Sequence, residues 1–408
     1  MSIRDRSTRM PARRFGLALV AGALVLSCIP SAAAARHAPN RTAAELQRDV
    51  NALLATGATG VLAEVSAGSH RVAARAGVAD PAGRNPVAWD AKHRIESTTK
   101  PFVATVVLRL TAEGKLGLDD PVDRWLPGLV GTEVTVRQLL GHTSGLPDYA
   151  DDVPLAQATT AEQFDRERFR TYSPGQLVAM AMRHPPEFAP GQGWSYSNTN
   201  YVLAGMIIEK ATGAPWQQAV HERIIEPLGL TGTVIPGTSA YLPSPRLAAY
   251  QRLRPGDRPV DVSTRASGHA DASIISTPRD VNRFFEALLG GSLLPPAQLK
   301  EMQTTVRAEP FEAVWDEPGY GLGLMRRRLP CGGWVWFHGG GWWNAITDNA
   351  VTPDGRRAVT VAIASSLDPG QDPTAQAKAS AALIDHALCA DAAGTPYPRS
   401  GNPAMTAS

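Results

Sequence analysis

Three short motifs, far apart in the chain, contain the side chains best suited to acyl transfer. Ser97 precedes Lys100 by three residues, Tyr196 precedes Asn198 by two, and His338 follows much later, before a run of glycines. A serine hydroxyl is a weak nucleophile until a neighbouring base removes its proton, and a lysine or tyrosine with a suitable pKa can act as that base. The ordered set predicts a serine hydrolase that works through a covalent ester on Ser97.

Each motif alone can arise by chance, whereas all of them in this order rarely do. The chain has six lysines, and only Lys100 has a serine three residues before it. Of its eight tyrosines, only Tyr196 is followed two residues later by an asparagine. The combination of these patterns therefore favours a functional site.

The segment after the first motif positions the nucleophile. Residues 99–110 are apolar with helical spacing, so Ser97 is expected at the start of a helix and Lys100 on the same face one turn on. A helix N-terminus offers N–H groups and partial positive charge where an oxyanion must develop. Asn198 is suited to hold a substrate amide. The sequence leaves open whether Lys100 or Tyr196 takes the serine proton.

Each candidate residue also has a purely structural explanation, and the alternatives stay open at this stage. Ser97 could be only a helix N-cap, Lys100 a solvated side chain, and His338 a core histidine beside a tight turn. Tyr196 and Asn198 could be turn residues. These explanations would all have to hold together to remove the predicted site.

Segments expected to form strands occur near both ends of the chain, and the middle is helical. We expect helices at 43–55, 99–110, 136–140, 173–184, 200–211, 280–289 and 373–390, and strands at 60–66, 70–78, 320–328, 333–337, 344–351 and 359–365. This pattern predicts an α/β (α+β) fold, in which an antiparallel sheet built from both termini and flanked by helices carries an inserted all-α lobe. The hydrolase domain would span 36–390, with a sheet lobe at about 43–115 and 275–390 and the all-α lobe at about 116–274. Residues 391–408 are expected to be a disordered tail.

The bulk composition excludes several classes of function. With 408 residues, 43% of them hydrophobic and 19% charged, the chain is an ordinary globular protein. The net charge of +2 is misleading, because residues 1–35 hold five arginines and one acid, which leaves about −2 on the rest. A nucleic acid is therefore not an expected partner. The nine histidines are scattered, so we expect no metal site, no cofactor is implied, and His142 is interpreted as structural.

The first 35 residues have the organisation of an export signal. Arginines come first, then an apolar run at 15–29, then Ser31 and four alanines suited to cleavage. We therefore expect a secreted or periplasmic protein with no stable membrane insertion after cleavage. An uncleaved anchor, the twin-arginine route through Arg13 and Arg14, and a lipoprotein anchor on Cys28 remain alternatives.

Two cysteines, Cys331 and Cys389, remain after removal of such a signal. An even pair in an exported protein favours a disulfide, because the compartment is oxidising. Two buried free thiols are the alternative.

At the three motifs that contain Ser97, Tyr196 and His338, the chain resembles the penicillin-recognising serine hydrolases. This family includes class C β-lactamases, low-molecular-weight penicillin-binding proteins and related esterases. The chain is most similar to secreted D-alanyl-D-alanine carboxypeptidases. The resemblance covers about 42–390 and includes the blocks 95–103, 136–146, 190–201, 205–213, 320–324 and 338–340. The resemblance implies that Ser97 is the nucleophile and that Lys100 and Tyr196 transfer protons. It implies that the substrate is contacted by Asn198, His338, Gly339, Gly340 and Gly341, and that the N–H groups of Ser97 and Gly341 form the oxyanion hole. It also implies a disulfide between Cys331 and Cys389.

The chain departs from the carboxypeptidase pattern where those enzymes bind a terminal carboxylate. Met325 stands at the position of a carboxylate-binding arginine, and Gly339 and Gly341 stand where threonines would be expected. A methionine cannot pair with a carboxylate. Either Arg326 or another base has taken this role, or the substrate has no carboxylate there.

Two further departures concern the pocket itself. Glu96, directly before the nucleophile, should disfavour a nearby anion, and Trp342 with Trp343 should add apolar bulk. We expect D-alanyl-D-alanine carboxypeptidase-type amide hydrolysis of cell-wall peptides. An esterase on neutral acyl substrates, a β-lactamase and a non-turnover penicillin-binding protein are the alternatives. The expected partners are a small peptide, ester or β-lactam substrate and peptidoglycan, and the expected state is a monomer.

Overall fold

A computed structural model describes residues 42–81, 83–131, 133–365 and 372–389 of the chain. The predicted export signal and the predicted tail lie outside the described residues. Within the described ranges, no helix is long and apolar enough to cross a membrane.

An antiparallel sheet combines segments from both ends of the chain, as predicted. The hairpin β1 (Ala58–Ala67) and β2 (His70–Gly77) pairs through β1 with β13 (Arg357–Ser365), and Val61 lies opposite Ile363. The sheet continues in the order β2-β1-β13-β12-β10-β9-β8-β7, with β11 paired to β12. The remaining strands are β12 (Ala345–Val351), β11 (Gly340–Trp342), β10 (Trp334–Phe337), β9 (Met325–Arg328), β8 (Gly319–Tyr320) and β7 (Val306–Arg307). β13 is rich in β-branched residues and almost entirely buried, as expected of a central strand covered on both faces.

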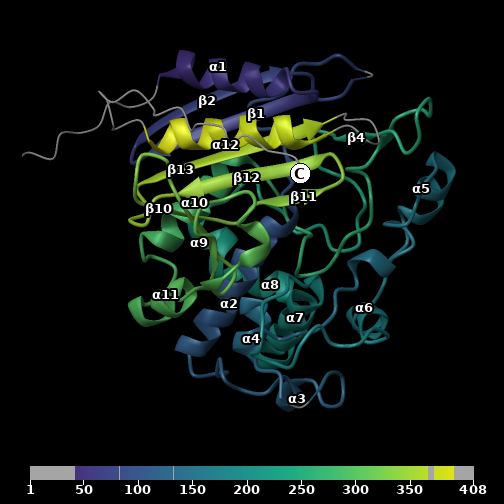
Figure 1. Cartoon of the computed structure of the whole chain (residues 1–408), viewed down its shortest axis with the longest axis vertical. Helices are drawn as coiled ribbons and strands as arrows, with labels where there is room; N and C mark the ends of the chain where they lie inside the picture. The colour runs from purple at the N-terminus through teal and green to yellow at the C-terminus, as the bar shows by residue number, and fades with distance from the viewer. Residues whose placement is uncertain (1–41, 82, 132, 366–371, 390–408) are drawn as a thin grey trace, which may run out of the picture. The chain divides into compact units, whose positions relative to one another are not determined.

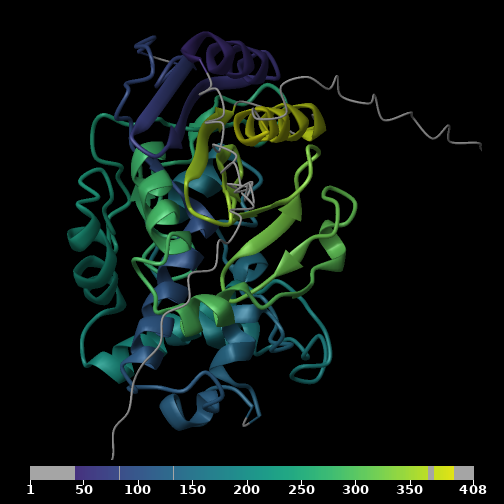
Figure 2. The same cartoon turned by 90° about the vertical axis from the view of Figure 1, so that its left-hand side faces the viewer.

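Helices cover both faces of this sheet. α1 (Ala43–Leu54) begins at a capping box in which Thr42 and Glu45 exchange hydrogen bonds. It lies beside α12 (Thr374–Leu388), and Figures 1 and 2 show the two helices, purple and yellow, next to each other. α10 (Pro278–Leu289) packs against β1 and β13 from the opposite face. The expected α/β architecture is confirmed.

A helical layer lies below the sheet in Figure 1 and surrounds the buried helix α2 (Thr99–Ala112). α2 packs against α7 (Asn198–Thr212) and α8 (Trp216–Val220). The other helices are α3 (Val122–Trp125), α4 (Val136–Gly141), α5 (Ala161–Glu167), α6 (Pro174–Ala181), α9 (Glu226–Leu228) and α11 (Pro296–Gln303). The packing of α2 against α7 brings the first two motifs together.

Several details differ from the sequence-based expectation, and one of them is the unexpected pairing of β3 (His93–Arg94) with β6 (Ile275–Ser276). The segment 320–328 is two short strands separated by a turn, in which Gly323 has a φ of +81°, a conformation that favours glycine. β11 was not expected as a separate strand. The inserted segment, expected to be all helical, also contains a ribbon of β4 (Tyr250–Gln251) and β5 (Val260–Asp261).

Cys331 and Cys389 form a disulfide in the structure, with Cα atoms 5.8 Å apart. The bond connects the β9–β10 turn to the residue that follows α12.

Candidate active site

The nucleophile candidate Ser97 lies in a single 3₁₀ turn, Glu96–Thr98, that leads directly into α2. Glu96 has a φ of +48°, a left-handed conformation that is unfavourable for a side chain of this kind and that tends to persist at functional sites. The side chain of Ser97 is not an N-cap, because the cap residue of α2 is Thr98 and no side-chain cap bond forms. The hydroxyl of Ser97 instead accepts a hydrogen bond from Lys100.

Lys100 is fully buried and holds its ammonium group among oxygen atoms. Its Nζ lies 3.0 Å from Ser97 Oγ, 2.7 Å from Asn198 Oδ1 and 3.1 Å from the carbonyl oxygen of Asp271. Burial lowers its pKa to about 8, although the negative charges of Asp271, Asp148 and Glu96 oppose this shift. The alternative that Lys100 is a solvated surface residue is therefore wrong.

The ring of Tyr196 packs against Lys100, and the ammonium group of Lys100 lies 4.7 Å from the centre of that ring. Burial raises the pKa of Tyr196 well above its usual value, and a hydrogen bond with Ser97 acts in the opposite direction. The phenol is therefore neutral near pH 7, whereas the lowered pKa of Lys100 makes a neutral amine accessible near pH 8. These shifts favour Lys100 as the group that accepts the serine proton, and Tyr196 as a hydrogen-bonding partner of the hydroxyl.

His142 packs against the second motif and accepts a hydrogen bond from it. It follows α4 with a φ of +57°, and its ring centre lies 4.3 Å from that of Tyr196. Its Nδ1 accepts hydrogen bonds from the Ser197 N–H at 3.2 Å and from Asn200 Nδ2 at 3.1 Å. Burial lowers the pKa of His142 well below its usual value, so the ring stays neutral. These contacts fix the start of α7 and agree with the structural interpretation of His142.

His338 lies close to Tyr196, with ring centres 6.3 Å apart, but does not line the cavity described below. Its Nδ1 lies 2.8 Å from the Gly339 carbonyl oxygen, which can only accept, so Nδ1 carries the proton and Nε2 accepts from the Tyr320 hydroxyl at 3.0 Å. Burial lowers the pKa of His338 to about 3, so it is neutral. Thr98 Oγ1 donates to the His338 carbonyl oxygen at 2.7 Å. His338 thus anchors the turn before β11 to the nucleophile segment.

β11 runs directly beside the backbone of the nucleophile. A Cβ atom at Gly340 would lie 2.2 Å from the Ile95 carbonyl oxygen and 2.8 Å from the Ser97 nitrogen, so only glycine permits this approach. A Cβ atom at Gly341 would meet no atom nearer than 3.9 Å. The close approach explains the glycine at 340 and brings β11 beside Ser97. The assignment of the Ser97 and Gly341 N–H groups as oxyanion donors stays a prediction.

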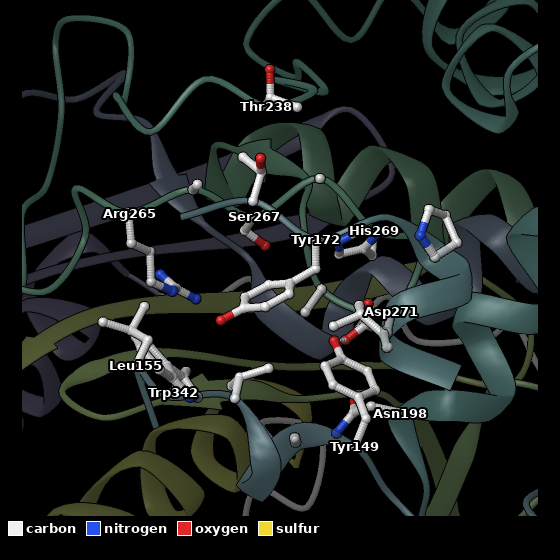
Figure 3. A pocket seen from close by; sticks show the side chains of 18 of the residues that line it. Tyr149, Leu155, Tyr172, Asn198, Thr238, Arg265, Ser267, His269, Asp271 and Trp342 are labelled. Atoms are coloured by element: carbon white, nitrogen blue, oxygen red, sulfur yellow. Dashed lines mark hydrogen bonds between the residues drawn. The ribbon is translucent and has the colours of Figure 1, made fainter. Parts of the chain in front are cut away.

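A cavity of about 410 Å³ opens in front of Ser97. Of the residues expected from the sequence, Ser97, Asn198 and Gly341 line it, together with Trp342. Lys100, Tyr196, His338, Gly339 and Gly340 are outside the set of residues that line the cavity. Figure 3 shows Asp271, Tyr149 and Asn198 together on one side of the cavity, and Arg265, Leu155 and Trp342 on the other.

The two arginines of the cavity wall each have a carboxylate partner. Arg265 pairs with Glu96 at 2.7 Å and lies over the ring of Trp342 at 4.1 Å, and Arg170 pairs with Glu167 at 3.2 Å. The negative charge of Glu96 is therefore compensated, which the sequence could not reveal.

The residues that the sequence places at the carboxylate-binding position, Met325 and Arg326, do not line the cavity. Met325 is 3% exposed and packs in the core beside the sheet, outside the cavity wall. Arg326 lies over the ring of Trp334 at 4.4 Å and does not line the cavity either. Trp343 stacks on Trp342 with ring centres 4.5 Å apart. Arg326 therefore does not take over the role of the missing arginine at this cavity.

Sequence reasoning missed two carboxylates and a tyrosine. Asp148 accepts from Asn198 Nδ2 at 2.8 Å, and Asp271 accepts from the hydroxyl of Tyr149 at 2.8 Å. Asp148 and Tyr149 follow soon after the turn at His142, so their place in the sequence could have indicated that they lie near the site. Nothing in the local sequence marks Asp271. Among the described residues, no group of three or more His, Cys, Asp or Glu side chains could hold a metal ion.

Comparisons with known proteins agree with this fold. The Beta-lactamase family model matches residues 46–385. The solved structure of a D-stereospecific amidohydrolase from a Streptomyces species is 40% identical, with a TM-score of 0.75, and the match covers 86% of this chain and 99% of that one. The D-amino acid amidase of Ochrobactrum anthropi SV3, solved with L-phenylalanine amide, is 27% identical with a TM-score of 0.73, covering 85% and 97%.

Among curated sequences, Penicillin-binding protein 4* of Bacillus subtilis (strain 168) is 30% identical over 281 residues. This match covers 65% of the present chain, and the chain spans only 59% of the length of that relative.

Proposed function

The chain belongs to the Beta-lactamase family of serine hydrolases, and from this premise we propose that it cleaves small amides of D-amino acids through an acyl-enzyme on Ser97. The observation that carries the proposal is the combination of the Ser97–Lys100 contact with a cavity whose two arginines already bind carboxylates. A terminal carboxylate, which a carboxypeptidase substrate must present, finds no free arginine or lysine among the described residues of the wall. An amide with a neutral leaving group needs none.

The residues divide the reaction as follows. The neutral amine of Lys100 accepts the proton of Ser97 Oγ as this oxygen attacks the carbonyl carbon, and the N–H groups of Ser97 and Gly341 stabilise the resulting oxyanion. The C–N bond then breaks, and the leaving amine takes the proton held by Lys100 and Tyr196. Water attacks the serine ester and gives up a proton to the same pair. The bond between the acyl carbon and Ser97 Oγ then breaks, Ser97 Oγ takes that proton back, and the carboxylic acid is released.

The relatives support amide hydrolysis on D-configured substrates. Two solved structures above 25% identity are named as a D-stereospecific amidohydrolase and a D-amino acid amidase. Carboxypeptidase action on cell-wall peptides, our expectation from sequence, keeps the same bond type and nucleophile but requires a carboxylate ligand. We therefore favour amides without a terminal carboxylate.

Ester hydrolysis is the second candidate. Trp342, Leu155 and Val153 give part of the cavity an apolar wall, which suits neutral acyl groups. An ester also has a better leaving group than an amide and needs no further residue. The same acyl-enzyme serves both reactions.

One panel of substrates tests these proposals. Purified protein is incubated with D-phenylalaninamide, a D-Ala-D-Ala peptide, p-nitrophenyl butyrate and a fluorescent penicillin. Release of ammonia from the D-amide with slower peptide cleavage supports the proposal. Ester cleavage with an inert amide would replace it by the esterase. Stable penicillin labelling without turnover would indicate a binding protein, and penicillin hydrolysis a β-lactamase.

Two variants connect the activity to the nucleophile. Ser97→Ala should abolish both turnover and covalent labelling, a loss of at least about 10³-fold. Ser267→Ala removes another hydroxyl that lines the same cavity and should change neither. Labelling that persists in Ser97→Ala would require a different nucleophile.

We also propose export as the route to the site of action. The first 35 residues have the charge and apolar pattern of an export signal, and the Cys331–Cys389 disulfide suits an oxidising compartment. Cell fractionation tests this: protein found only in the cytoplasm with its first 35 residues intact would contradict it.

A further inference from the structure

Asp271 places a carboxylate at the cavity wall beside the nucleophile, and from its surroundings we infer that it binds the free α-ammonium group of the substrate. The inference rests on the proposed function, because it concerns the acyl part of the same substrate. It restricts that substrate to D-aminoacyl amides and esters with an unmodified amine. Peptides and penicillins whose amine is acylated would be disfavoured.

One oxygen of Asp271 is available for such a contact. The residue is 4% exposed and lines the cavity, and its Oδ2 accepts from Tyr149 at 2.8 Å. No protein hydrogen bond to its Oδ1 is seen among the described residues, and because the residue lines the cavity this oxygen is open to a ligand. An ammonium group offers the charge-assisted donor that this oxygen lacks.

The neighbouring carboxylate Asp148 shows the contrast. Asp148 Oδ2 accepts from Asn198 at 2.8 Å, and its Oδ1 accepts from the Ala150 N–H at 3.0 Å. Both oxygens are thus engaged by the protein, and Asp148 does not line the cavity. Asp148 orients Asn198, whereas Asp271 is left to interact with a ligand.

The charge balance of the site also favours a cation. Two basic side chains, Lys100 and Arg265, face three carboxylates, those of Glu96, Asp148 and Asp271. This excess of negative charge becomes larger when Lys100 is neutral, which is the form proposed for catalysis. A bound ammonium group compensates it, and a bound carboxylate would increase it.

The position of Asp271 matches that of an α-amine. Lys100 Nζ contacts both Ser97 Oγ and the backbone carbonyl oxygen of Asp271, at 3.0 and 3.1 Å, and both Ser97 and Asp271 line the cavity. An α-ammonium group is two bonds from the carbonyl carbon that Ser97 attacks. With the amine at Asp271, the apolar wall of Leu155 and Trp342 on the opposite side can receive the side chain (Figure 3).

Two substrates that differ only in the amine test the inference: D-phenylalanine p-nitroanilide and 3-phenylpropionic acid p-nitroanilide. The ratio of their kcat/KM values is measured for the wild type and for Asp271→Asn, which keeps the shape and the acceptor for Tyr149. We expect the wild type to prefer the amine-bearing substrate and the variant to lose about 10- to 100-fold of this ratio. Glu301→Gln is the control for a general change of charge, because Glu301 does not line the cavity and its partner Arg137 keeps a second carboxylate, Asp119. Its ratio should equal that of the wild type.

Each outcome decides. A wild-type ratio near one, or a ratio unchanged by Asp271→Asn, overturns the inference, and the first measurement does not depend on folding of the variant. An equal fall of the ratio in Glu301→Gln would indicate a general charge effect and would also overturn it. Hydrolysis of p-nitrophenyl butyrate reports the integrity of the nucleophile in every sample. If both anilides and the D-amide are inert while the ester is cleaved, the proposed amidase fails; if the anilides are cleaved equally, only the ammonium site fails.

Discussion

Lys100 Nζ lies 3.0 Å from Ser97 Oγ, one helical turn away, and the lysine side chain is completely buried. A buried ammonium group loses hydration, so its neutral form is favoured. This relationship couples the fold to the reactivity of the nucleophile.

The pH dependence of acylation should follow the titration of Lys100. Because burial lowers its pKa to about 8, the fraction of neutral amine, and with it kcat/KM, should rise from pH 6 to 9 with a midpoint near 8. Because the pKa of Tyr196 is raised, its ionisation should cause no decline of kcat/KM between pH 6 and 9. Stopped-flow acylation with a p-nitrophenyl ester measures the profile. Lys100→Arg, whose side chain stays charged, should lose activity at every pH, and a midpoint near 6 in the wild type would point to a histidine as the base.

The same titration affects stability. Because the pKa of Lys100 is lower in the folded chain than in the unfolded one, the unfolded chain binds more protons between about pH 8 and the usual lysine value. The contribution of Lys100 to the free energy of unfolding therefore rises with pH over that interval and is least favourable below pH 8.

Gly340→Ala should separate β11 from the nucleophile. The added methyl group would meet the Ile95 carbonyl oxygen at 2.2 Å, so the strand must move and the oxyanion donors move with it. We expect kcat to fall about 10²- to 10³-fold, the loss typical of an oxyanion donor. Gly339→Ala is the comparison, since its nearest contacts would be 3.4 Å. Similar losses in both variants would mean that the close approach of Gly340 is not the cause.

Met325→Arg should destabilise the protein rather than create a carboxylate site. Met325 is 3% exposed within the core, and an unpaired charge there costs about 3–5 kcal/mol of unfolding free energy. Met325→Leu, which preserves volume and polarity, should cost less than about 1.5 kcal/mol. Urea denaturation measures both. Equal stability of the two variants would show that the side chain at 325 reaches water or the cavity.

Removal of the disulfide should lower stability with little effect on the site. Cys331 and Cys389 close a loop with a sequence separation of 58, for which loop entropy predicts a loss of about 4 kcal/mol. The variant with both residues changed to serine should unfold at lower urea but keep its kcat/KM at 25 °C. Wild-type stability in that variant would show that the bond does not form in the protein.

The fold and the motif residues were predictable because each depends on local patterns. Helical spacing after Ser97 placed Lys100 correctly, and the hairpin at 58–77 follows from alternating β-prone residues. Residues whose role arises only from long-range packing were not predictable. Asp271 has no local signature, and the pairing of Glu96 with Arg265 joins residues 169 positions apart. The role of Met325 also depended on which face of β9 is buried.

The hydrogen bond between Thr98 and the His338 carbonyl oxygen connects residues separated by 240 positions. A polypeptide emerging from the ribosome therefore has its serine and lysine long before the strand that completes the oxyanion pocket has been synthesised. Chains that end before residue 338 lack the carbonyl oxygen that Thr98 binds, so we expect them to be inactive. Enzymatic rate can thus serve as a direct readout of complete folding, with no added label.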